Sequence, residues 1–205
     1  MRGFIKMICC IGTILFWGGY ANAQESVARF GVKTGINYSG QHGVTASKNK
    51  FGFNAGITLD FRLSPHIYLL TGLEYTIKGA KSDDTSDKSG TFETPTYLQL
   101  PFHVGYMYPV SREVRLVVHA GPYMAYGIGG KVEINNSTGG EKSKIDYFGV
   151  NVGKFDWGLG LGLNVEYNSF VLGTGYDRGL RNFAPIHNDG KARTKNLYMT
   201  LGYLF

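Results

Sequence analysis

The stretch from Phe155 to Tyr167 alternates strictly between two kinds of residue. Its odd positions are aromatic or aliphatic, and its even positions are glycine, asparagine or a carboxylate. Because successive side chains of a β-strand point to opposite faces, one face of this strand is wholly apolar, with aromatic rings at both ends. Such a face is typical of barrel strands that contact lipid, and a tilted strand needs only about 9–11 residues to cross a bilayer. The pattern predicts a transmembrane β-strand.

The same alternation returns in seven further stretches. It is weakest in Phe170–Leu180, where Thr174 and Arg178 share the apolar face. The seven stretches are Arg29–Tyr38, Phe51–Arg62, His66–Lys78, Thr96–Tyr108, Glu113–Ile128, Phe170–Leu180 and Asn196–Phe205. We therefore predict an all-β fold, an eight-stranded antiparallel up-and-down transmembrane β-barrel.

The connections between these strands alternate in length. With the eight strands numbered in chain order, so that Phe155–Tyr167 is the sixth, the connections after the second, fourth and sixth strands are tight turns. Those after the first, third, fifth and seventh are long and polar, namely Ser39–Lys50, Gly79–Pro95, Gly129–Lys154 and Arg181–Lys195. Outer-membrane barrels have short periplasmic turns and longer extracellular loops. The sequence thus predicts four long extracellular loops and both termini in the periplasm.

A soluble barrel of lipocalin type would turn the apolar face inward. The glycine-rich face would then meet water, and we would expect many lysines and glutamates on it. A narrow eight-stranded barrel has room inside only for side chains. Glycine beside Asp, Glu, Arg, Tyr and Gln fits that crowded interior, which favours the membrane barrel.

The N-terminus has the features of a signal peptide. Arg2 and Lys6 precede a short apolar core, and Ala21-Asn22-Ala23 forms an A-x-A cleavage site before Gln24. The apolar core is shorter than the roughly 20 residues of a spanning helix. We predict a signal peptide over residues 1–23 and one barrel domain over 24–205. Both cysteines of the chain lie in the predicted leader, so the mature barrel has no disulfide framework.

The chain ends on an aromatic residue in phase with the apolar face of the last strand. Leu201, Tyr203 and Phe205 share that face. This end resembles the signal by which bacterial outer-membrane barrels are recognised for insertion. We expect the outer membrane of a Gram-negative bacterium as the location, and outer-membrane lipid and the barrel-assembly machinery as partners.

Composition agrees with this prediction and narrows the partners. The 205 residues include 30 glycines, 14 tyrosines and 13 phenylalanines, enough aromatic rings for two girdles. The formal charge of +6 mildly favours anionic partners. The basic residues form no dense block, so we expect no nucleic-acid partner.

Charged residues concentrate on the face predicted to line the lumen. They are Arg29, Lys33, Asp60, Arg62, Glu74, Lys78, Glu113, Arg115, Asp156, Glu166 and Asp177. Buried charges are tolerated when they are paired and hydrogen-bonded, and five cations against six anions are close to balance. We predict a structural plug of ion pairs, with a narrow ion path as the alternative. Replacing Gly160 by serine is expected to cost far less than replacing Leu161 by arginine, because a small hydroxyl can find a partner in this lumen, with crowding between strands as the limit.

The sequence contains no pattern that predicts catalysis, a cofactor or a metal. His66, His103 and His119 are predicted to point inward, where an ordinary hydrogen bond is a better explanation than a metal ion. The acidic residues of 83–87 lack the D-x-D-x-D-G spacing of a calcium loop.

Several short motifs resemble a known family of membrane barrels. They are Tyr97-Leu98-Gln99-Leu100-Pro101, Gly121-Pro122-Tyr123, Phe155-Asp156-Trp157-Gly158, Gly175-Tyr176-Asp177-Arg178-Gly179-Leu180 and the terminal Asn196–Phe205. In these motifs the chain resembles the PorT-like outer-membrane β-barrel proteins of Bacteroidetes. The motifs belong to the barrel scaffold, so the resemblance implies a fold and a location but no active site.

Three functions follow from these observations. The first is a non-enzymatic outer-membrane protein that acts as a structural or interaction scaffold through its long loops, where a protein partner would bind. The second is a lipid-modifying enzyme, which would need a histidine near a serine and an acid; only His42 and His187 lie in the loops. The third, a component of a secretion apparatus, is implied by the resemblance to the family's namesake.

Overall fold

The structure is a computed structural model, which describes residues 28–42, 47–83, 90–135, 142–146, 148, 153–181 and 193–205. The predicted signal peptide lies outside these residues. Within them, no helix is long and apolar enough to cross a membrane.

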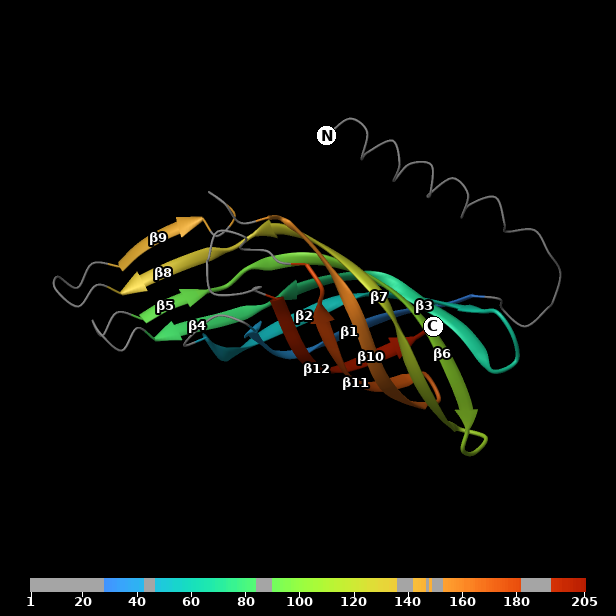
Figure 1. Cartoon of the computed structure of the whole chain (residues 1–205). Helices are drawn as coiled ribbons and strands as arrows, with labels where there is room; N and C mark the ends of the chain where they lie inside the picture. The colour runs from blue at the N-terminus through green and yellow to red at the C-terminus, as the bar shows by residue number, and fades with distance from the viewer. Residues whose placement is uncertain are drawn as a thin grey trace.

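Eight strands form a closed antiparallel barrel, as the sequence predicts (Figure 1). They are β1 (Ala28–His42), β2 (Ser47–Arg62), β3 (Ile67–Ile77), β6 (Thr96–Pro109), β7 (Val114–Gly129), β10 (Phe155–Tyr167), β11 (Phe170–Gly179) and β12 (Arg193–Leu204). Each strand pairs with its sequence neighbours in the barrel, and β1 pairs with β12 to close the ring. Closure leaves no open sheet edge in the wall, which a bilayer requires because unpaired backbone groups are costly in hydrocarbon.

The alternation of β10 has the predicted phase. Its odd residues are exposed on the outside of the barrel, and Leu161, near the middle, keeps 60% of its surface exposed. The flanking Gly160 and Gly162 are buried in the lumen. The other strands also present exposed aliphatic and aromatic side chains outward, and together these make a belt around the barrel. An apolar outer belt of this extent would be unstable in water and is stabilised by lipid.

The glycines of β10 leave room for large side chains from other strands. A Cβ on Gly158 would lie 2.7 Å from the ring of Tyr123, and one on Gly162 would lie 2.5 Å from the imidazole of His119. A Cβ on Gly160 would lie 2.6 Å from the carboxylate of Asp177. The expected crowding at Gly160 thus comes from the side chains of His103 and Asp177, which must shift to admit any side chain there.

Four short strands continue the barrel wall beyond its rim. They are β4 (Gly79–Asp83), β5 (Gly90–Glu93), β8 (Lys131–Asn135) and β9 (Lys142–Asp146). They pair in the order β2-β4-β5-β8-β9 and extend the sheet away from the barrel (Figure 1). We call this sheet the platform. The sequence prediction placed all four strands in long polar loops, so the platform is a correction to it.

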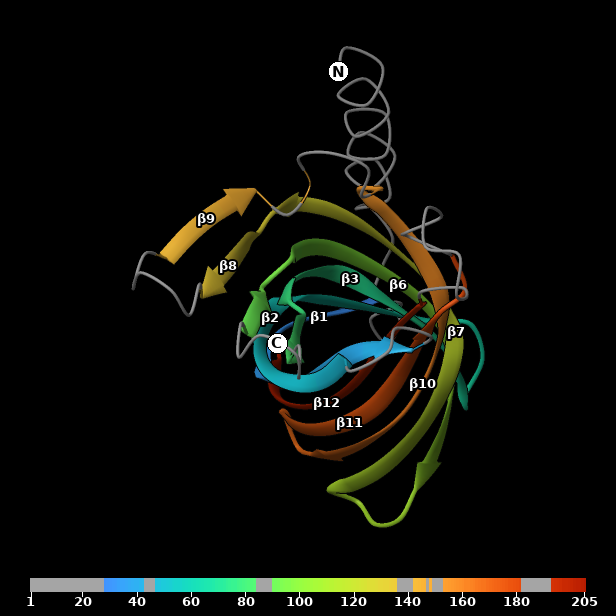
Figure 2. The same ribbon diagram turned by 60° about the vertical axis from the view of Figure 1, so that its left-hand side comes forward.

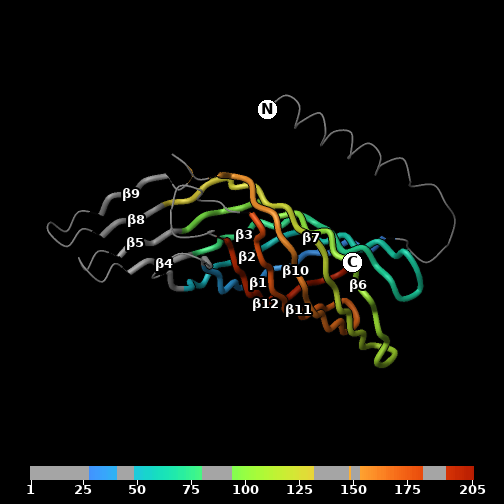
Figure 3. The backbone as a smooth tube through the Cα atoms, in the orientation of Figure 1, coloured from blue at the N-terminus to red at the C-terminus, as the bar shows by residue number. Residues whose placement is uncertain are grey.

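The short turns and the C-terminus lie at the end of the barrel opposite the platform (Figures 1 and 3). The turn between β10 and β11 is two residues long, and its Asn168 has a positive φ of 52°. Asparagine tolerates this left-handed conformation better than most residues, which suits a tight hairpin. Two residues predicted to begin strands are not part of them: His66 and Glu113 lie in the exposed turns before β3 and β7. Strands β1, β2 and β12 begin earlier than predicted, at Ala28, Ser47 and Arg193.

Candidate functional site: the charged lumen

The lumen at the short-turn end is occupied by a cluster of charges. Arg29 is the second residue of β1. It donates two hydrogen bonds to the carboxylate of Glu166 at 2.8 and 3.0 Å and one to Asp60 at 3.1 Å. Arg115 from β7 approaches the same Glu166, with Nε 3.0 Å from the carboxylate. The Arg29 guanidinium also lies 5.1 Å from the ring centre of Tyr68. Five strands of the wall are thus joined across the barrel at this end.

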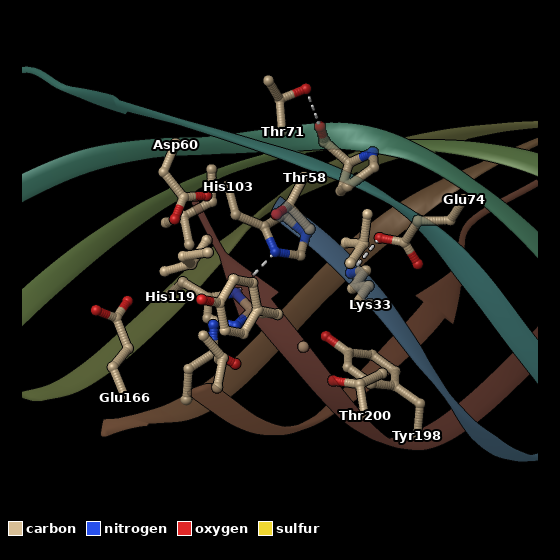
Figure 4. A pocket seen from close by; sticks show the side chains of 18 of the residues that line it. Lys33, Thr58, Asp60, Thr71, Glu74, His103, His119, Glu166, Tyr198 and Thr200 are labelled. Atoms are coloured by element: carbon tan, nitrogen blue, oxygen red, sulfur yellow. Dashed lines mark hydrogen bonds and ion pairs between the residues drawn. The ribbon is translucent and has the colours of Figure 1, made fainter. Parts of the chain in front are cut away.

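A second ion pair and two histidines surround a small cavity in mid-lumen (Figure 4). Lys33 on β1 pairs with Glu74 on β3 at 2.5 Å. The rings of His103 on β6 and His119 on β7 stack, and their Nδ1 atoms lie 2.9 Å apart, so one ring donates and the other accepts. The cavity of about 70 Å³ is lined by both polar and apolar side chains and is large enough for a few water molecules, which is far less than an aqueous channel.

Two carboxylates near the platform end are held by neutral donors. Asp177 accepts a hydrogen bond from the amide of Gln99 at 3.1 Å and a long one from Asn196 at 3.5 Å. Asp156 accepts one from Thr194 at 2.9 Å. The hydroxyl of Tyr123 donates a further, weaker hydrogen bond to Asp156 at 3.4 Å.

Lys78, between β3 and β4, is a buried cation. Its Nζ has no hydrogen-bond partner among the described residues. It lies 4.9 Å from the ring centre of Tyr123 and 5.4 Å from that of Tyr97. The faces of aromatic rings attract cations, and this contact compensates part of the charge's lost hydration.

Most of the charged residues predicted for the lumen lie there. Nine of them line the three groups just described, namely Arg29, Lys33, Asp60, Glu74, Lys78, Arg115, Asp156, Glu166 and Asp177. Arg62 is half-buried at the last residue of β2. Glu113 is exposed in the turn before β7 and is not part of the lumen, because the strand begins one residue later. His66 likewise lies outside, where its ring contacts the outward Tyr106.

A network of neutral residues in the lumen was not singled out from the sequence. Asn37 on β1 donates to the hydroxyl of Thr76 at 2.7 Å and accepts from Asn54 at 2.5 Å. Ser39 exchanges two hydrogen bonds with the backbone of Gly79, where β4 begins. All of these side chains lie at inward-facing positions of their strands. The alternation of the sequence is the signal from which they could have been found.

The described residues bring together no group suited to hold a metal ion, since no cluster of three or more His, Cys, Asp or Glu has the required arrangement. The arrangement does join the walls of the barrel through ion pairs and hydrogen bonds between residues distant in sequence. Arg29 and Glu166, for example, are 137 positions apart.

The residues of the predicted insertion signal lie on the outer surface at the short-turn end. Phe205 is 73% exposed, and its ring stacks on that of Phe30 with centres 5.7 Å apart. Its backbone N–H donates to the carbonyl of Phe30 at 2.8 Å. Tyr203 contacts Phe205 edge-on, and Leu201 is exposed on the same face.

The barrel is closed and eight-stranded, with a polar lumen and an apolar outer belt bordered by aromatic rings. This combination defines a transmembrane β-barrel of the bacterial outer membrane. Residues 22–184 match the family described as "Outer membrane protein beta-barrel domain", and the chain belongs to that family. Its location is accordingly the outer membrane. No curated protein matches the sequence.

Solved barrels with similar folds have low sequence identity to this chain. Ail, the attachment invasion locus protein of Yersinia pestis, is 16% identical with a TM-score of 0.46, covering 87% of this chain and 99% of its own. Neisserial surface protein A is 15% identical with a TM-score of 0.41, covering 86% and 97%. Outer membrane protein OprG from Pseudomonas aeruginosa is 11% identical with a TM-score of 0.34, covering 87% and 94%.

Proposed function

We propose that this protein is a non-enzymatic outer-membrane scaffold that binds a protein partner through the platform on the extracellular side. The platform is the observation that carries the proposal. Strand β2 pairs with β4, and the chain runs directly from β3 into β4, from β5 into β6 and from β7 into β8. The sheet of β4, β5 and β8 is therefore held by the wall of the barrel beyond the membrane. A rigid barrel that presents a sheet outside the bilayer suits recognition.

The lumen supports a structural role for the barrel interior. The Arg29–Glu166 ion pair crosses the bore at the short-turn end, Lys33–Glu74 joins β1 to β3 in mid-lumen, and eight-stranded barrels hold only side chains inside. We propose that the charged residues form a plug that stabilises the barrel. The narrow ion path remains the competing function for the same residues, and conductance measurements separate the two.

The other two functions have weaker support. His103 and His119 bond to each other, and neither contacts a serine in the part of the chain that the structure describes. The side chain of His42 and all of His187 lie outside the described residues, so no catalytic arrangement supports the lipid-modifying enzyme. Membership among PorT-like barrels of Bacteroidetes, and with it a role in secretion, is a proposal supported by the sequence motifs alone.

Assembly partners follow from the C-terminal residues. We propose that the outward row of Leu201, Tyr203 and Phe205 is recognised by the barrel-assembly machinery before the barrel closes. The N-terminal leader would direct export and be removed after Ala23.

A cross-linking experiment tests the scaffold function. A photoreactive amino acid replaces Lys131, which is exposed where the platform begins, or Arg112, which is exposed in a short turn at the opposite end. In living cells, we expect one discrete protein adduct from position 131 and none from 112. If position 131 gives no adduct and the purified barrel conducts ions in planar bilayers, the protein is a channel and the scaffold function is wrong.

A further inference from the structure

Two adjacent strands carry positive charges on the outside of the barrel at the platform end. Arg178 on β11 is paired in register with Lys195 on β12. Both lie in the outward phase, since Tyr176 and Leu197, two residues away on their strands, are exposed while Asp177 and Asn196 are buried. Figure 2 shows these two strands side by side, with β10 next to them.

These cations occupy the first positions beyond the apolar belt. On β11 the outward residues from the short turn are Phe170, Leu172, Thr174 and Tyr176, and Arg178 follows just before the strand ends. On β12 the order from the C-terminus is Tyr203, Leu201, Met199 and Leu197, and Lys195 follows. The charges thus lie where the hydrocarbon of a bilayer gives way to headgroups.

Two further arginines extend the group. Arg193 lies two residues from Lys195 on the same face of β12, and its buried Nε has no hydrogen-bond partner in the described part of the chain. Arg181 donates to the carbonyl of Phe155 at 2.7 Å, and its guanidinium lies 5.8 Å from the centre of that ring. We call Arg178, Arg181, Arg193 and Lys195 the rim cations.

No carboxylate is described near the rim cations on the outer surface. The acidic residues of the same strands, Asp156 and Asp177, are buried in the lumen. Among the described residues, no ion pair joins a rim cation to an acid. The charge of this group is therefore not paired with a described carboxylate, and Arg178 and Lys195 carry it at outward positions of the wall.

The opposite wall differs at the same end of the barrel. There the described outward residues of β2, β6 and β7 are uncharged, and they include Phe51, Leu98, Tyr126 and Ile128. The exposed Lys131 and Lys154 lie beyond these strands, at the start of β8 and just before β10.

We propose that the rim cations form a binding site for the phosphate groups of a phosphorylated glycolipid in the outer leaflet of the membrane. Guanidinium groups bind phosphate through paired hydrogen bonds, and the lysine adds a point charge. The exposed aliphatic and aromatic side chains immediately below would contact the acyl chains of the same lipid. The placement in the outer leaflet rests on the proposed orientation, in which the platform end is extracellular.

The test measures binding of bisphosphorylated lipid A to the purified barrel in detergent, by native mass spectrometry of the protein–lipid complex. Each basic residue near an anionic lipid surface contributes to binding, so we expect about a 5-fold weaker Kd for each rim cation removed. Arg178→Gln combined with Lys195→Gln should weaken binding roughly 30-fold on the same basis. Arg178→Lys should keep most of the affinity.

A matched control removes two positive charges elsewhere. Arg112→Gln with Lys131→Gln changes the net charge equally, at two exposed positions outside the rim cations, and should leave binding unchanged. Heat-modifiable gel migration establishes that each variant is folded. Because the isolated barrel is used, the result does not depend on any protein partner of the platform.

Four results would overturn the proposal. Equal affinity of the rim variant and the control variant would show that the rim cations are not the site. Equal affinity for lipid A and for lipid A stripped of its phosphates would show that phosphate is not recognised. Full displacement of lipid A by inorganic phosphate, or equally tight binding of phosphatidylglycerol, would replace the glycolipid site by a general anion-binding surface.

Discussion

Replacing Glu166 by glutamine tests the charged cluster at the short-turn end of the lumen. The Glu166 side chain is only 1% exposed, and it receives two hydrogen bonds from Arg29 and a close contact from Arg115. Removing one partner of a buried ion pair costs about 3–5 kcal/mol, because the remaining charge is left without compensation. Arg29 keeps Asp60 at 3.1 Å, and Arg115, 36% exposed, can be hydrated. We therefore expect the lower end, about 3 kcal/mol.

The assay is equilibrium unfolding in urea of the barrel in detergent or liposomes. Trp157 is the fluorescent probe, since the only other tryptophan lies in the predicted signal peptide. With slopes of about 1–3 kcal/mol per molar urea, a loss of this size moves the midpoint by roughly 1–3 M. Glu113→Gln is the matched control: the carboxylate is exposed in a turn at the same end, so its loss should stay within about 0.5 kcal/mol. Equal midpoints for the two variants would refute the argument that the cluster stabilises the barrel.

Three further predictions concern the wall of the barrel. Leu161→Arg should cost about 2–4 kcal/mol by placing a cation near the bilayer midplane, and Phe170→Arg near the interface about 0–1 kcal/mol; equal costs in the same urea assay would contradict this depth dependence. Gly160→Ala should cost about 1–3 kcal/mol through collision with buried side chains, whereas Gly129→Ala, whose Cβ would meet nothing within 4 Å, should not. A stable Gly160→Ala barrel would show that the lumen is loosely packed. Deleting Phe205 should impair assembly in cells, measured as loss of heat-modifiable barrel in the outer membrane; normal insertion would exclude the C-terminal signal.

The barrel could be predicted from the sequence because lipid enforces the pattern. A strand with lipid on one side and a packed polar lumen on the other must alternate strictly, and Phe155–Tyr167 has the same bounds in the structure as in the prediction. The platform strands are outside the bilayer, so no apolar face marks them, and their sequences look like polar loops. Turn residues such as Glu113 alternate in phase with the adjoining strand and were for that reason assigned to it.

The partners within the lumen could not be predicted. Alternation places Arg29 and Glu166 on the same side of the wall, but their contact depends on the closure of the ring and on the stagger of strands across it. The same limit applies at Gly160, since the sequence shows a glycine without showing that His103 and Asp177 fill the space beside it.

The direction in which the strands face is the central claim, and accessibility measures it most directly. Single cysteines replace Leu159, Leu161 and Leu163 in the mature barrel, and each carries a fluorophore in a liposome-reconstituted protein. A cysteine at Asn164, which lines the lumen cavity, is the control. We predict that brominated lipids quench the fluorophores at the three leucine positions, whereas a water-soluble quencher does not reach them. Quenching at those three positions by the water-soluble agent alone would contradict the membrane-barrel account.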